Sequence, residues 1–70
     1  MASHWHYQVM RHKSDNGYWY GIHEYYPLPD GEAGWTENTI GLDAETVDEL
    51  REMLWLILKD IDEHGVKDYE

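Results

Sequence analysis

Histidine is the residue type best placed to do chemistry in this chain, because five histidines occur among 70 residues. Imidazole nitrogens bind divalent metals and change protonation near neutral pH. His6, His12 and His23 fall on one face of an expected hairpin, so three imidazoles could meet on one surface. Their spacing matches no known site, and histidines on exposed strands usually serve as polar surface. We therefore expect no metal and no cofactor.

Carboxylates are the second candidate, since 15 Asp and Glu face only five Lys and Arg. Catalysis with two metal ions needs several acidic residues on neighbouring strands. Only Glu24 and Glu37 fall in expected strands, and most other acids lie in the expected helix or loops. The sequence therefore predicts a protein that is not an enzyme, with a metal-dependent enzyme as a remote alternative.

The formal net charge of -10 argues against direct binding of nucleic acid, because the basic residues that contact phosphates are missing. Acidity of this degree serves either solubility or attraction of a basic partner. There is no cysteine, and no apolar run approaches the ~20 residues of a membrane span. The N-terminus also lacks the basic and apolar regions of a signal peptide. We expect a single domain over residues 1–70, in the cytoplasm and without a membrane partner.

The first half of the chain predicts a β-hairpin that carries most of the histidines. Residues 4–13 alternate in character, and residues 18–26 form the returning strand. Asn16-Gly17 indicates a two-residue type I′ turn, which would pair Lys13 with Tyr20 and Val9 with Glu24. The more apolar face is the expected core side: Trp5, Tyr7, Val9, Tyr18, Tyr20, Ile22 and Tyr26. The other face holds His4, His6, Met10, His12, Trp19, His23 and Tyr25.

The middle of the chain predicts a loop and a third strand. Residues 27–31 contain two prolines and a Pro-Asp-Gly turn signal, so they cannot form a central strand. Residues 33–40 resume extended character and would pair antiparallel with the second strand. Residues 66–69 could form a short fourth strand or a tail.

Residues 46–63 give the only long helical signal. Thr46 and Glu49 have capping-box spacing, and Gly65 is a common type of residue at a helix end. Six residues gather in one stripe that should pack on the sheet: Val47, Leu50, Leu54, Ile57, Leu58 and Ile61. Met53 and Trp55 flank this stripe, whereas Leu56 lies on the opposite side. Met53 and Leu56 are three residues apart, so they can form a patch that is either buried by a partner or left in water.

These elements predict an α+β fold: a three-stranded antiparallel sheet, with a possible short fourth strand, packed on one long C-terminal helix. Three consecutive parts of the chain together resemble a known family: the run Y-W-Y-G-I-H-E-Y-Y, the Pro-rich loop, and the following W-T-E-N-T-I-G-L-D-A-E-T-V-D-E-L-R-E-M-L. In this order they resemble the N-terminal domain of HicB-like antitoxins. The resemblance implies a truncated RNase H-like fold and a protein-binding role without operator DNA binding.

We therefore expect a small acidic, antitoxin-like module that binds and neutralises a basic protein partner and is itself a homodimer. The partner would be toxin-like or a nucleic-acid-binding protein. The predicted binding surface joins the outer hairpin face to the acidic side of the helix: Trp19, His23, Tyr25, Glu49, Glu52, Met53, Leu56, Asp60 and Glu63. The alternative is a nucleic-acid mimic from a phage or mobile element that inhibits a nucleic-acid-binding defence protein. Carboxylates repeating at the ~7 Å spacing of phosphates would favour this alternative.

Overall fold

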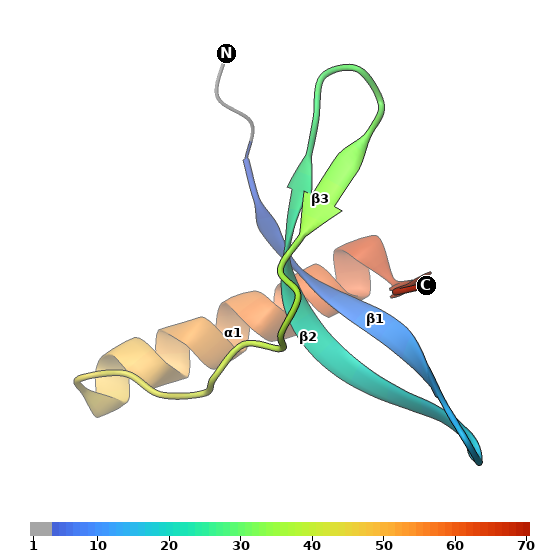
Figure 1. Cartoon of the computed structure of the whole chain (residues 1–70). Coiled ribbons are helices and arrows are strands. Elements are labelled where there is room, and N and C mark those ends of the chain that lie inside the picture. The colour runs from blue at the N-terminus through green and yellow to red at the C-terminus, as the bar shows by residue number, and fades with distance from the viewer. Residues whose placement is uncertain (1–3) are drawn as a thin grey trace.

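The computed structural model describes residues 4–70, which form one four-stranded sheet and one helix (Figure 1). The strands are β1 (His6–Ser14), β2 (Gly17–Pro27), β3 (Ala33–Trp35) and β4 (Val66–Asp68), and the helix is α1 (Val47–His64). Their order in the sheet is β3-β2-β1-β4. The first three strands are antiparallel, whereas β4 runs parallel to β1. The predicted α+β class is confirmed, and the optional fourth strand makes the sheet a mixed one.

The hairpin turn lies one residue earlier than predicted. Ser14 pairs with Gly17, so Asp15 and Asn16 form the loop, and Val9 pairs with Ile22 instead of Glu24. A type I′ turn needs positive φ at both central residues, and among the described residues only glycines adopt it, with φ 143° at Gly17. The predicted turn is therefore wrong by one residue, and the predicted pairing partner of each β1 residue is wrong by two residues. Such a shift leaves every side chain on its own face, so the two predicted faces keep their members.

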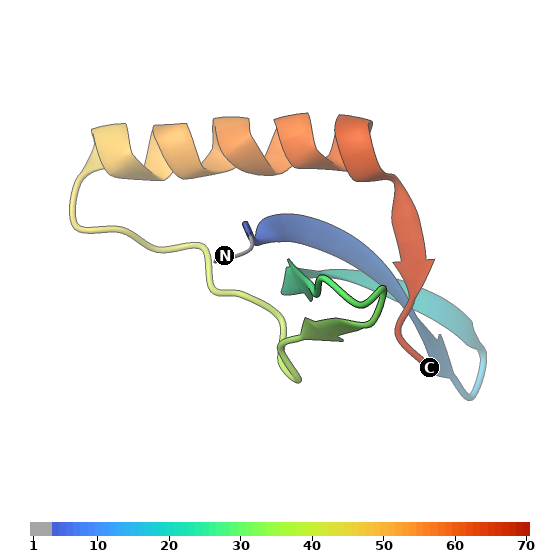
Figure 2. The same cartoon turned by 90° about the horizontal axis from the view of Figure 1, so that it is seen from above.

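The sheet is the middle layer of the molecule. Helix α1 lies behind it, and the segment that follows β3 crosses in front (Figures 1 and 2). The Thr36 N–H donates to the Glu24 carbonyl, and the Ile40 N–H donates to the Ile22 carbonyl. Four residues of this segment thus span two residues of β2, so residues 37–39 bulge over the sheet. The predicted third strand is consequently shorter than expected and ends at Trp35.

The deepest burial lies on the face covered by this bulge, and the predicted core side is wrong in that respect. Among the described residues, the buried apolar side chains are only Met10 and Ile57. The buried polar side chains are Gln8, His12 and His23. On the predicted core face, Tyr18, Tyr20, Trp5 and Tyr26 are exposed. The reason is topological: the end of the hairpin extends away from α1 (Figure 1), while the bulge and the C-terminal residues cover the opposite face.

Helix α1 begins and ends where the caps predict. The Thr46 hydroxyl accepts a hydrogen bond from the Glu49 N–H at 3.1 Å, and the Gly65 N–H donates to the Ile61 carbonyl. Gly65 has φ 67°, a conformation that glycine adopts without steric cost. No helix in residues 4–70 is long and apolar enough to cross a membrane.

The contact face of the helix is rotated from the predicted stripe. Leu50, Ile57 and Ile61 face inward as expected, but Val47, Leu54 and Leu58 are exposed. Their places are taken by Met53, Asp60 and His64, which are half-buried. Two contacts favour this rotation. The Asp60 carboxylate accepts a hydrogen bond from the Tyr7 N–H at 2.9 Å, and the His64 ring stacks on the His6 ring with centroids 3.6 Å apart.

The packing of the bulge on β2 generates a stability test at Gly21. A Cβ added there would collide with the Thr39 side chain and lie 3.1 Å from the Trp19 ring. We expect Gly21→Ala to lower the free energy of unfolding by about 1–3 kcal/mol, measured by urea denaturation. Gly34→Ala is the matched control, because a Cβ at Gly34 meets nothing within 4 Å. Equal effects of the two substitutions would contradict this packing.

Candidate functional site

A pair of buried histidines joins β1 to β2 beneath the bulge. The Nε2 atoms of His12 and His23 lie 2.8 Å apart, and His23 is fully buried, with 0% of its surface exposed. The His23 Nδ1 lies 2.8 Å from the Thr36 carbonyl oxygen, which can only accept. His23 therefore carries its proton on Nδ1, and its Nε2 accepts a hydrogen bond from the Nε2–H of His12. The hydrogen-bond partners thus assign the tautomer of each ring.

Aromatic rings flank this histidine pair. Trp19 stacks on His12 at 3.9 Å between ring centroids, and Tyr69 stacks on His12 at 4.3 Å. The Tyr69 hydroxyl also donates to the Glu37 carbonyl at 3.2 Å, which ties the C-terminus to the bulge. Beside the pair lies a hollow of about 370 Å³, lined by His12, Trp19, His23, Glu37, Asn38, Thr39 and Tyr69.

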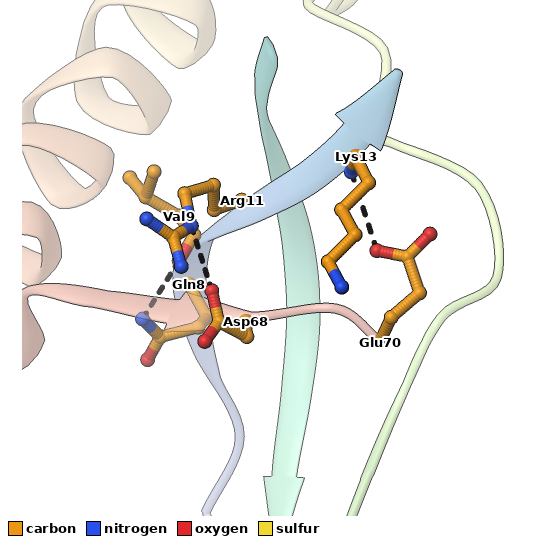
Figure 3. A network of polar contacts seen from close by, with 6 residues as sticks. All are labelled: Gln8, Val9, Arg11, Lys13, Asp68 and Glu70. Carbon is orange, nitrogen blue, oxygen red and sulfur yellow. Dashed lines mark hydrogen bonds and ion pairs between the residues drawn. The ribbon is translucent and has the colours of Figure 1, made fainter. Parts of the chain in front are cut away.

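Strand β4 and the residue Glu70 after it form a polar network along β1 (Figure 3). The Gln8 side-chain amide donates to the carbonyls of Val9 and Gly65, at 3.0 and 2.8 Å. The Arg11 Nε donates to the Asp68 carboxylate at 2.8 Å, and the Tyr69 N–H donates to the Arg11 carbonyl. The Lys13 N–H donates to the Glu70 carboxylate at 3.3 Å. The hydrogen bond to Asp68 raises the pKa of the Arg11 guanidinium, which therefore stays charged.

The histidine pair serves as a structural link more readily than as a metal centre. The nitrogens that face each other already form a hydrogen bond, and the Nδ1 of His23 is bonded to Thr36. His6 lies apart from them, because its ring stacks on His64. The three-histidine surface considered from the sequence is thus not assembled, although two of its members do meet.

A different group could supply ligands to a divalent cation. Ligand atoms of Asp60, Glu63 and His64 lie within 4.8 Å of one another in the last turns of α1. The sequence signal for this group is the spacing D-x-x-E-H, which places three ligands on one side of a helix. Asp60 also has a structural task here, because its carboxylate accepts the Tyr7 N–H.

Negative charge near Asp60 also affects Tyr7. Burial of Tyr7, and then the neighbouring Glu24 and Asp60 carboxylates, raise the pKa of the phenol above its usual value of 10.0. The folded chain therefore disfavours the phenolate. Since the unfolded chain ionises first, stability should fall as the pH rises through and above about 10.

The predicted binding residues divide between the two sides of the sheet. Trp19 is partly exposed and stacks on His12, His23 is buried, and Tyr25 stacks parallel to Trp35 at 5.8 Å. On the helix, Glu49, Glu52, Leu56 and Glu63 are exposed, whereas Met53 and Asp60 are half-buried. Since α1 and the bulge lie on opposite faces (Figure 2), the nine residues do not form one surface.

Comparison with protein-family models, with curated proteins and with solved structures found no match for this chain. The resemblance to HicB-like antitoxins therefore stays a prediction.

The histidine link generates a second stability test. His12→Phe keeps a ring that can stack on Trp19 but leaves the buried His23 Nε2 without its donor. We expect a loss of about 1–3 kcal/mol in the free energy of unfolding, measured by urea denaturation. His4→Phe, at an exposed position, is the control and should change stability by about 0.5 kcal/mol or less. Nitrogen NMR of the unmodified chain should show His23 protonated on Nδ1; protonation on Nε2 would contradict the assignment.

Proposed function

We propose that this chain is a small acidic protein-binding module of HicB-like type, which occupies and neutralises a basic protein partner. The observation that carries the proposal is one side of α1, where exposed carboxylates surround an apolar side chain. Glu49, Glu52 and Glu63 are exposed, and Leu56 among them is 38% exposed. We name these four residues the acidic helix side. An apolar centre with a charged rim is the usual composition of a protein-binding surface.

The two other helix residues predicted for this surface are Met53 and Asp60, and they face the sheet instead of solvent. Met53 is half-buried, and Asp60 accepts the Tyr7 N–H. Both therefore help to hold α1 on β1, and their loss would disturb the helix itself. Tests of partner binding consequently belong on the acidic helix side.

The spacing of these carboxylates favours a protein partner over mimicry of nucleic acid. With a rise of about 1.5 Å per residue, Glu49 and Glu52 are about 4.5 Å apart along the axis, and Glu63 is about 16 Å further. This is no repeat at ~7 Å, the spacing of phosphates along a strand. A cation also interrupts the row, because Lys59 lies 3.8 Å from the Glu63 carboxylate. Mimicry of nucleic acid remains the alternative function.

Charge reversal on the acidic helix side tests this function. Glu49→Lys with Glu52→Lys should weaken binding of the basic partner by about tenfold or more and flatten its salt dependence, because favourable charge pairs become repulsive. Tagged chain would first capture partners from the source cell. Affinity for each purified basic candidate would then be measured by calorimetry at low and high salt.

The matched control makes the same change of charge elsewhere. Glu32→Lys with Asp43→Lys reverses two exposed carboxylates outside the helix. This variant should retain the partner with nearly unchanged affinity. Equal losses in the two variants would mean that only net charge matters, and unchanged binding by the helix variant would refute the proposed surface. A partner that exchanges the chain for nucleic acid on the same site would favour the mimic.

A further inference from the structure

An apolar stripe on α1 has no partner within the described chain. Leu54, Leu58 and Val47 are 47%, 59% and 70% exposed, and Trp55 beside them is 61% exposed. Their spacing of four and seven residues places the three aliphatic side chains on one side of the helix. This side is distinct from the acidic helix side, because Leu56 lies well round the helix from them. Half of the six residues predicted to form the core are therefore left in water.

The size of the exposed surface matches what one partner would cover. The chain has an accessible surface of 5469 Å². A compact folded monomer of 8.4 kDa exposes about 4,600 Å². The excess of roughly 850 Å², to which exposed aromatic residues of the hairpin also contribute, is comparable with the ~800 Å² that each partner buries in a standard interface. The radius of gyration agrees, since it is 13.2 Å against about 11 Å for a compact chain of this length.

Charges on the stripe are arranged so that the surface complements itself. Arg51 and Asp62 lie on the same side of α1, one toward each end, with Leu54 and Leu58 between them. Consider a two-fold axis perpendicular to the helix, level with residues 56–57. It places Leu54 of one copy against Leu58 of the other and Arg51 against Asp62. A parallel pairing would instead oppose Arg51 to Arg51 and Asp62 to Asp62. Within residues 4–70 of one chain, the only ion pair of Arg51 is with the exposed Asp48, at 3.7 Å.

The start of the helix is also open to a second copy, because Val47 is 70% exposed there. The N-terminal part of α1 also extends beyond the sheet (Figure 2), which leaves that end open to a second helix. A contact in which residue i meets j and j meets i is the interface of a two-fold dimer.

From these observations we infer that a second copy of this chain covers the stripe, with the two α1 helices antiparallel and the Arg51–Asp62 pairs at the rim. The seam thus contains Val47, Leu54, Trp55 and Leu58, and the Met53–Leu56 patch lies outside it. In this dimer the two acidic helix sides stay outside the seam and accessible to other proteins.

The oligomeric state of the full chain tests the seam. Sedimentation equilibrium should give twice the 8.4 kDa mass of one chain. Leu54→Glu with Leu58→Glu should weaken dimerisation at least about 100-fold, because each dimer would then bury four charges. Both residues are exposed in the single chain, so circular dichroism should show an unchanged helix. Leu56→Glu is the control and should leave the dimer intact.

Charge exchange tests the antiparallel arrangement without altering the apolar residues. Arg51→Glu or Asp62→Arg alone should weaken the dimer by about tenfold, and the double variant should restore most of the loss. A monomeric unmodified chain at high micromolar concentration would overturn the inference. So would dissociation by Leu56→Glu but not by Leu54→Glu with Leu58→Glu, or absence of rescue in the double variant.

This inference stands apart from the proposed function, because the two use different sides of α1. A dimer that survives Glu49→Lys with Glu52→Lys but loses its basic partner would support both. If Leu54→Glu with Leu58→Glu abolishes the dimer while the basic partner still binds, the dimer and the proposed function are independent of each other.

Discussion

The hydrogen-bond chain from His12 through His23 to the Thr36 carbonyl is the contact on which the rest of this small structure depends. It joins β1, β2 and the segment after β3, at distances of 2.8 Å for each step. Tyr69 then stacks on the same rings, so the C-terminus is fixed to the same point. Polar side chains can be buried here because each finds a partner, and no buried side-chain nitrogen or oxygen in the described chain lacks one.

This arrangement explains why a chain with 14% aromatic residues has so few buried apolar side chains. The bulge and Tyr69 cover one face of the hairpin, and α1 packs mainly on β1 on the other face (Figures 1 and 2). The aromatic residues at the end of the hairpin therefore stay in water. Arg11 lies over the Tyr18 ring at 4.3 Å, and Trp5 packs against Tyr7, so some of the aromatic surface is used in local contacts.

Three sides of helix α1 have different roles. One side packs on β1 through Leu50, Ile57 and Ile61. Asp60 on the same side accepts a hydrogen bond from the Tyr7 N–H. The second side is the acidic helix side, to which we assign partner binding. The third carries the apolar stripe, to which we assign a second copy of the chain. A helix of 18 residues offers enough surface for all three, because the N-terminal part of α1 extends beyond the sheet (Figure 2).

Local sequence patterns were enough to predict the capped helix, the hairpin, the start of the third strand and the α+β class. These follow from local rules, since Thr46, Gly65 and the alternation of residues 4–13 act through neighbouring backbone. The sequence also grouped the hairpin side chains into the right two faces, because an error of two residues in register preserves them. The sequence did not predict which face of the hairpin is buried or which side of α1 is free, because both depend on contacts between distant segments. These contacts include the bulge over Gly21 and the hydrogen bond of Asp60 with Tyr7, 53 residues apart. No periodicity within one element encodes such contacts.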